Sequence, residues 1–110
     1  MPSVLVVDDD VAVVELVAAR LRMLDMEADT ATSGRAAIKK LAARTVGQQL
    51  YDVVILDIVM PDVDGWQVLK AIKNNALWRE IPVVVISGVA DTPSDIVRII
   101  EYDGVFVEKR

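Results

Sequence analysis

The sequence predicts an α/β protein built on one parallel β-sheet that helices cover on both faces. Short runs of Val, Ile and Leu, most clearly residues 4–7, 53–56 and 81–86, have the uninterrupted apolar composition of strands buried on both sides. Stretches with helical spacing alternate with these runs. Strands that alternate with helices in this way are joined by right-handed crossovers and lie parallel.

The first predicted unit is a strand at residues 4–7 followed by a helix over about 11–24. Asp9 or Asp10 caps this helix, because acidic side chains satisfy the free N–H groups at a helix N-terminus. Capping explains one of the three consecutive aspartates and leaves the others for another role. The main apolar face of the helix consists of Val13, Val14, Val17, Leu21 and Leu24.

The second unit is a weaker strand at residues 27–31 and a helix over about 34–44. Thr32 or Ser33 caps this helix. A polar loop at residues 45–50 then returns the chain to the sheet. The apolar face of the helix consists of Ala37, Ile38 and Leu41.

The third unit is a strand at residues 53–56 that runs directly into Asp57. Asp64 caps the following helix, which ends near residue 74 because Asn74-Asn75 stops it. The apolar face of this helix consists of Val68, Leu69 and Ile72.

The last elements are a strand at residues 81–86, a helix over about 93–102 and a strand at 104–108. Pro93 suits the first turn of the helix. Ser87 follows the fourth strand and Lys109 follows the fifth.

Composition limits the classes of function. A chain of 110 residues is one domain. The net charge is −5 with scattered basic residues, which argues against direct binding to nucleic acid. The absence of cysteine and histidine excludes disulfides, thiolate metal sites and imidazole bases. We expect a cytoplasmic protein that does not enter a membrane, since neither a signal peptide nor an apolar run of ~20 residues is present.

Polar residues at the strand ends predict a site for phosphoryl chemistry. Asp8 and Asp9 follow the first strand and Asp57 ends the third, and ligands bind outside the carboxyl ends of parallel strands. Three convergent carboxylates repel one another unless a cation lies among them, and oxygen ligands favour Mg²⁺. Ser87 and Lys109 approach the same edge and suit phosphoryl oxygens. A carboxylate can itself accept a phosphoryl group as an aspartyl phosphate.

These residues resemble a known family. Asp8-Asp9, Asp57 with Met60-Pro61 and Gly65 after it, Ser87-Gly88 and Lys109 are similar to the motifs of the receiver domain of two-component response regulators. The resemblance covers nearly the whole chain, so residues 1–110 are expected to be a single receiver domain. It implies a three-layer flavodoxin-like (CheY-like) fold with a five-stranded parallel sheet of order 2-1-3-4-5.

The resemblance also implies a metal centre and a phosphoacceptor. Asp57 would accept a phosphoryl group from a sensor histidine kinase or a phosphotransfer protein. Asp9 and Asp57 would ligate Mg²⁺ together with the backbone carbonyl of Val59, while Asp8 would act mostly through water.

Further roles follow from the same resemblance. Ser87 and Lys109 would hold the phosphoryl group, and Ser87 and Phe106 would change conformation as the switch. Val59 and Val89 would flank the path of the water that removes the phosphoryl group. Both side chains are apolar and cannot orient that water, so we expect slow self-dephosphorylation.

The sequence departs from the family pattern at its C-terminal end. Arg110 stands where the family has Pro after the lysine, so we expect a trans peptide bond and a shifted Lys109. Tyr102-Asp103 replaces the usual Gly-Ala before the last strand. The sequence stops at Arg110, so the fifth helix of the family is expected to be missing or truncated.

Two interpretations of function remain. The favoured one is a phosphorylatable receiver whose only chemistry is Mg²⁺-dependent phosphorylation and dephosphorylation of itself, and not an enzyme acting on other substrates. The alternative is a receiver-derived interaction module that does not switch. A haloacid dehalogenase-like hydrolase would need a second Asp at the position of Val59. Flavin- and dinucleotide-binding proteins would need a Ser/Thr-rich or glycine-rich loop after the first strand.

The first predicted helix carries a second apolar stripe. An apolar patch of this kind above an incompletely covered sheet usually marks a contact surface. We therefore predict a two-fold homodimer through this helix and the exposed half of the sheet. The stripe consists of Ala12, Leu16, Ala19 and Met23.

Overall fold

The computed structural model describes residues 1–47, 49–57, 65–87 and 105–108. Strands and helices alternate along most of this part of the chain, as the sequence predicts. The elements are β1 (Ser3–Val7), α1 (Val11–Met23), β2 (Glu27–Ala31), α2 (Gly34–Val46), β3 (Val53–Asp57), α3 (Gly65–Lys73), β4 (Val83–Ser87) and β5 (Val105–Glu108).

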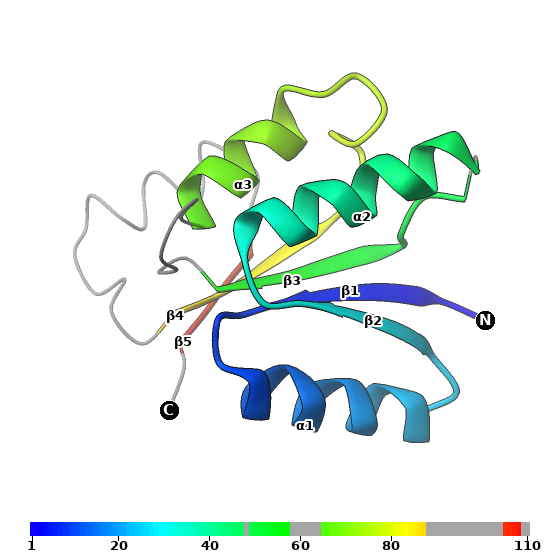
Figure 1. Ribbon diagram of the computed structural model, residues 1–110, viewed down its shortest axis with the longest axis vertical. Helices are drawn as coiled ribbons and strands as arrows, with labels where there is room; N and C mark the ends of the chain where they lie inside the picture. The colour runs from blue at the N-terminus through cyan, green and yellow to red at the C-terminus, as the bar shows by residue number, and fades with distance from the viewer. Residues whose placement is uncertain (48, 58–64, 88–104, 109–110) are drawn as a thin grey trace.

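All five described strands form one parallel sheet in the order β2-β1-β3-β4-β5, which confirms the predicted order (Figure 1). β1 and β3 are adjacent, and Val7 of β1 is level with Leu56 of β3. The residues that follow these two positions, Asp8 and Asp57, therefore lie side by side at one edge of the sheet. On the other side of β3, Asp57 is level with Ile86 of β4.

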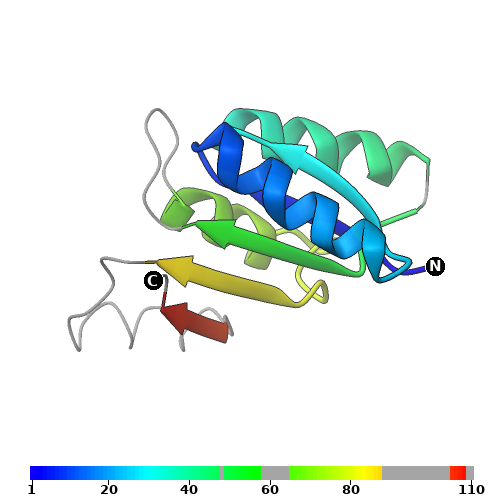
Figure 2. The ribbon, with the colours of Figure 1, turned by 90° about the horizontal axis from the view of Figure 1, so that it is seen from below.

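The helices cover the sheet from two sides, with α1 on one face and α2 and α3 on the other (Figures 1 and 2). The larger core lies under α2 and α3, where Leu5, Val54 and Leu56 of the sheet are fully buried. The smaller core lies under α1 and joins Val4 and Val6 to Val14. The two cores use alternate residues of the strands, as the period of two in a strand requires.

Helix α1 begins where predicted, and Asp10 is its N-cap. The Asp10 carboxylate accepts hydrogen bonds from the backbone N–H groups of Ala12 and Val13, at 3.0 and 3.4 Å. The prediction that Leu24 belongs to the buried face is wrong, because Leu24 lies beyond the last turn and is 67% exposed. Ala18 is buried instead.

Helix α2 begins after Ser33, whose hydroxyl accepts a hydrogen bond from the N–H of Ala36 at 3.1 Å. It ends at Val46, so the predicted loop at 45–50 begins too early. The hydrogen bonds of Thr45 accompany these two additional helical residues. The Thr45 hydroxyl donates to the carbonyl of Leu41 at 2.8 Å and accepts from the indole N–H of Trp78 at 2.7 Å.

The elements predicted for the second half are present where the structure describes it, although the bounds of β4 differ. Val68, Leu69 and Ile72 of α3 are buried in the larger core, as expected. β4 spans Val83–Ser87, later than the predicted 81–86, although Ile81 is buried before it. β5 occupies Val105–Glu108. The N-cap predicted at Asp64 and the helix predicted over 93–102 lie outside the described residues.

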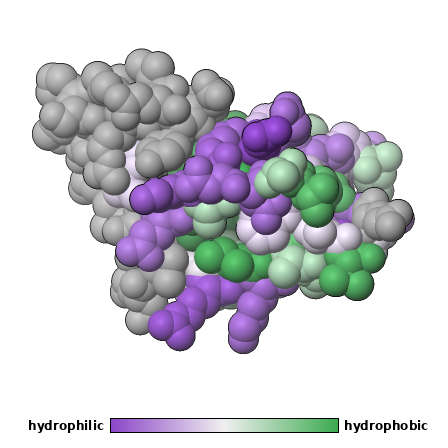
Figure 3. Space-filling model, turned by 90° about the horizontal axis from the view of Figure 1, so that it is seen from above, coloured by the Kyte–Doolittle hydropathy of each residue, from purple (hydrophilic) through white to green (hydrophobic). Residues whose placement is uncertain are grey.

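The face that carries α2 and α3 has a mixed surface, on which hydrophobic patches are separated by hydrophilic side chains (Figure 3). Arg35, Lys39 and Lys40 of α2 are exposed and contribute to this hydrophilic character. No helix in the described ranges is long and apolar enough to cross a membrane.

A cluster of polar side chains connects α2 with the edge strand β2 and with the loop before β3. The Tyr51 hydroxyl donates to the Asp29 carboxylate at 2.6 Å, and Arg44 lies over the Tyr51 ring at 4.5 Å from its centre. Arg44 also pairs with Glu27 at 2.6 Å and with Asp29 at 3.4 Å. Asp29, Arg44 and Tyr51 line a shallow surface pocket together with Lys40 and Ala43.

The cluster shifts two pKa values in opposite directions. Burial and the hydrogen bond to the Asp29 carboxylate raise the pKa of Tyr51 to about 12. Burial of Asp29 acts against its charged form, but the hydrogen bonds from Tyr51 and Arg44 outweigh it and lower the pKa of Asp29. The folded state therefore favours a neutral Tyr51 beside a charged Asp29.

We predict that this contact makes stability depend on pH in the alkaline range. The folded pKa of Tyr51 lies above the ordinary value of 10.0, so its contribution is complete below about pH 10 and is lost toward about pH 12. Wild type should lose about 1 kcal/mol more than Tyr51→Phe between about pH 9 and about pH 11.5, after allowing for screening at the partly exposed Asp29. Urea unfolding measures both proteins. If both proteins lost the same free energy of unfolding over this pH range, ionisation of Tyr51 would not be the cause of the pH dependence.

Candidate functional site

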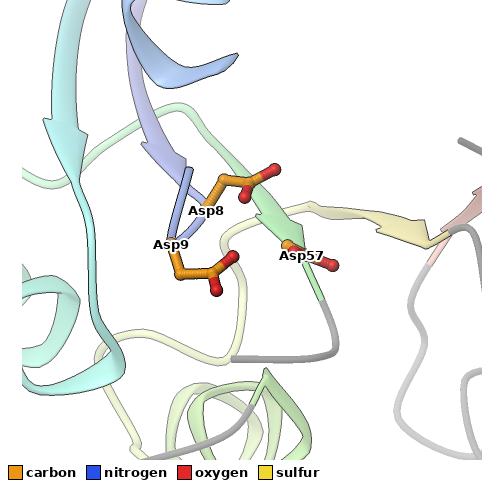
Figure 4. Close-up of side chains that lie close together, drawn as sticks. All are labelled: Asp8, Asp9 and Asp57. Carbon is orange, nitrogen blue, oxygen red and sulfur yellow. The ribbon is translucent and has the colours of Figure 1, made fainter. Parts of the chain in front are cut away.

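The candidate site lies at the carboxyl edge of the sheet, where β1 and β3 end side by side (Figure 4). Asp57 is the last residue of β3, and Asp8 directly follows β1. Their side chains meet because Val7 and Leu56, the residues before them, are level in the sheet. The sequence predicts this juxtaposition correctly.

Asp8, Asp9 and Asp57 form a compact acidic cluster. One carboxylate oxygen from each residue lies within 4.8 Å of those from the other two. Asp8 and Asp57 are buried, at 4% and 7% exposed, while Asp9 is exposed to solvent. The cluster therefore combines one solvent-exposed carboxylate with two buried ones.

Local hydrogen bonds give the three consecutive aspartates different roles. The N–H of Asp8 donates to the carbonyl of Ala31 at 3.1 Å, which holds this residue to the end of β2. The Asp8 carboxylate accepts the N–H of Asp10 at 3.0 Å. Asp10 caps α1, so its carboxylate serves the helix, whereas Asp8 and Asp9 belong to the cluster.

The donor set of the cluster suits a hard divalent cation. Three carboxylates at this separation repel one another, most strongly for the two that are buried, and a cation among them removes this repulsion. The ligands are oxygens only, and the exposed side leaves room for water. This combination fits Mg²⁺, which keeps several waters and takes a few carboxylate ligands.

The remaining predicted site residues are placed only in part. Ser87 is the last residue of β4, one position beyond the level of Asp57, so its backbone lies at the same edge of the sheet. The backbone of Phe106 lies in β5, level with Val85. Val59, Val89 and Lys109 lie outside the described residues.

Sequence reasoning missed the polar cluster of Asp29, Arg44 and Tyr51, which lies away from the acidic cluster. Its members are far apart in sequence and come from β2, α2 and the loop before β3. No spacing rule links such positions. The only signal was an acidic residue in the middle of a weak strand.

Comparison with known families decides what kind of domain carries this cluster. The sequence model of the response regulator receiver domain matches residues 4–109. The chain belongs to the response regulator receiver family. The resemblance inferred from the motifs is therefore confirmed over nearly the whole sequence.

Curated relatives of this receiver domain are longer response regulators. Response regulator PleD of Caulobacter vibrioides is 40% identical over 84 residues, which cover 76% of this chain and 17% of PleD. Heme response regulator HssR of Staphylococcus aureus is 34% identical over 87 residues, which cover 79% of this chain and 35% of HssR. The chain thus spans about a sixth to a third of the length of these relatives.

Solved structures show the same fold. The N-terminal domain of a response regulator receiver protein from Methanoculleus marisnigri superposes with a TM-score of 0.84 at 30% identity, covering 98% of this chain and 84% of that domain. Chemotaxis protein CheY4 of Vibrio cholerae gives 0.84 at 25% identity, with coverage of 99% and 87%. The phosphorylated cyanobacterial phytochrome response regulator RcpA gives 0.87 at 25%, with coverage of 99% and 81%.

Family membership establishes the general function. The chain is a phosphorylatable receiver of two-component signal transduction, a signalling domain and not a classical enzyme. The predicted CheY-like fold is confirmed.

We predict that the acidic cluster destabilises the domain when no divalent cation is bound. Asp57→Asn removes one charge at nearly constant shape, so in metal-free buffer it should raise the free energy of unfolding by roughly 1–3 kcal/mol. Added Mg²⁺ should raise the unfolding midpoint of wild type and have much less effect on the variant. Thermal unfolding with and without Mg²⁺ measures both. A loss of stability in metal-free Asp57→Asn would contradict the description of the cluster.

Proposed function

We propose that Asp57 is the phosphoacceptor of this receiver and takes its phosphoryl group from the phosphohistidine of a sensor histidine kinase or phosphotransfer protein. The observation that supports this most is the position of Asp57, nearly buried at a strand end within 4.8 Å of Asp8 and Asp9. Exposed aspartates elsewhere on the surface lack such neighbours in the described part of the chain.

The acidic cluster is proposed to hold one Mg²⁺. Asp9 and Asp57 would be direct ligands with the backbone carbonyl of Val59, and Asp8 would act through water. When bound, Mg²⁺ neutralises charge on the carboxylates and on the transferring phosphoryl group. The chain would contribute by holding Asp57 at the end of β3 and Asp9 two residues after β1, so that little reorganisation would accompany binding.

The proposed reaction is a transfer between two side chains. A carboxylate oxygen of Asp57 attacks phosphorus, the bond from phosphorus to the histidine nitrogen breaks, and the nitrogen keeps the electron pair. Ser87 and Lys109 are proposed to hold the phosphoryl oxygens, by a hydroxyl hydrogen bond and by charge. Water later attacks the phosphorus, which returns Asp57 and releases inorganic phosphate.

The signalling step is proposed to follow from Ser87 and Phe106, whose backbones lie on adjacent strands β4 and β5. Engagement of Ser87 by the phosphoryl group would change the position of Phe106. Val59 and Val89 are proposed to border the path of the attacking water without orienting it, which prolongs the phosphorylated state.

The setting proposed for this receiver is the cytoplasm. Residues 1–110 would act as one receiver domain whose partner is the phosphodonor protein, with no direct contact to nucleic acid or to a membrane. The net charge of −5 and the scattered basic residues support this proposal.

We predict that the wild-type protein gains the mass of one phosphoryl group when it is incubated with a small phosphodonor and Mg²⁺. Asp57→Asn should gain none, because the amide is not a competent phosphoryl acceptor. Asp25→Asn is the matched control, since Asp25 is exposed and has a φ of 61°, a conformation that Asn tolerates well. Intact-mass spectrometry measures the mass of all three proteins before and after the incubation.

Two results would contradict the proposal. Phosphorylation of Asp57→Asn at the wild-type level would place the acceptor elsewhere. Wild type that stays unmodified while binding Mg²⁺ normally would favour a receiver-derived interaction module that does not switch. Omission of Mg²⁺ should prevent modification of wild type and of Asp25→Asn alike.

A further inference from the structure

We propose that two copies of this chain associate through α1, which pairs with α1 of a second copy in antiparallel orientation around a two-fold axis. The contact surface is the outer stripe, defined as Ala12, Leu16, Ala19 and Met23. All four residues are exposed, and the two large ones are 61% (Leu16) and 82% (Met23) exposed. Exposed large apolar residues aligned on one helix face typically mark a contact surface.

The outer stripe faces directly away from the sheet. Successive residues of a helix are ~100° apart, which places the stripe about half a turn from the face formed by Val14 and Ala18. That face is buried on the sheet, and α1 lies on the outside of its layer (Figure 2). The sheet residue Ile55 packs in the smaller core beneath α1, so a contact through the stripe does not involve it.

The stripe is complementary to itself in antiparallel orientation. Its four positions are symmetric about the midpoint between residues 17 and 18. In an antiparallel pair centred there, Leu16 lies opposite Ala19 of the second copy, and Met23 lies opposite its Ala12. Each large side chain therefore meets a small one at every position along the seam, which lets the helices approach closely and fill the space between them.

A parallel pair lacks this complementarity. Leu16 would meet Leu16 of the second copy and Met23 would meet Met23, while the alanines would face one another across a gap. Only the antiparallel arrangement gives uniform spacing along the helix. The spacing of the four positions follows from helical periodicity, and it is the alternation of small and large side chains along them that favours the antiparallel pair.

Charged residues at the edge of the stripe support the same arrangement. Glu15 and Arg22 border the same edge and lie on the same side of an antiparallel pair. Glu15 then falls within about 3 Å along the axis of Arg22 of the second copy. The Arg22 guanidinium is already held by the carbonyl of Ala28 at 2.8 Å, and its other N–H groups can meet a carboxylate. Two such pairs form around the two-fold axis and favour this register.

The contact surface on α1 is small, so we expect a weak dimer. α1 has 13 residues and is about 20 Å long. One helix pair of this length buries less than the ~1,200 Å² of a stable interface. The expected dimer is therefore weak and depends on protein concentration, and it does not require phosphorylation.

Sedimentation velocity over a concentration series tests the surface. Wild type should change from monomer to dimer as concentration rises, and Leu16→Glu should raise the dissociation constant at least tenfold. Leu77→Glu is the matched control, because Leu77 is 57% exposed outside α1 and should leave dimerisation unchanged. A wild type that stays monomeric at millimolar concentration overturns the proposal, as does equal weakening by both variants.

Crosslinking tests the orientation, and the chain suits it because it has no cysteine. Ala12→Cys and Met23→Cys are mixed and oxidised. The antiparallel register brings these two positions together and separates each from its own copy by about 16 Å along the helix axis. A covalent dimer containing one of each variant is expected. Disulfide dimers formed mainly by either variant alone would overturn the antiparallel register.

Discussion

The repulsion among Asp8, Asp9 and Asp57 is the interaction on which the rest of this site depends. The sheet forces these carboxylates together, because parallel pairing of β1 with β3 ends both strands at one edge. Burial of Asp8 and Asp57 weakens the shielding by water and makes their charges costly. A bound cation would relieve this repulsion, whereas a phosphoryl group on Asp57 would add negative charge and increase the need for the cation.

The surrounding fold keeps the cluster in place largely through contacts outside it, although Asp8 itself is hydrogen-bonded to β2 and to the N–H of Asp10. Leu5, Val54 and Leu56 anchor the central strands in the larger core, and Asp10 fixes the start of α1. The polar cluster around Arg44 and Tyr51 secures α2 to the edge strand, away from the acidic residues. Most of the contacts that stabilise the fold thus lie in other parts of this small domain than the residues proposed for its chemistry. The outer stripe of α1 is a third part, with its own proposed role.

Much of this could be predicted from the sequence, because the strongest signals here are local. Apolar runs of Val, Ile and Leu identify buried strands, and the acids at the ends of those runs identify the site. The ends of helices were harder to predict than the strands. Helix α2 continues to Val46, and Thr45 near its end accepts a hydrogen bond from the indole of Trp78, which is 33 residues away in sequence. Leu24 fitted the helical spacing but lies past the last turn, where periodicity no longer applies. Long-range polar contacts such as that of Tyr51 with Asp29 leave no spacing pattern to read.

The central claim is that the three aspartates form one site for a divalent cation. Calorimetric titration of the unphosphorylated protein with Mg²⁺ tests it most directly, with Asp9→Asn beside wild type and Asp25→Asn as control. The claim predicts one ion per chain for wild type and Asp25→Asn, and a loss of affinity of at least tenfold in Asp9→Asn. Equal affinity in all three proteins, or no binding by wild type at millimolar Mg²⁺, would contradict it.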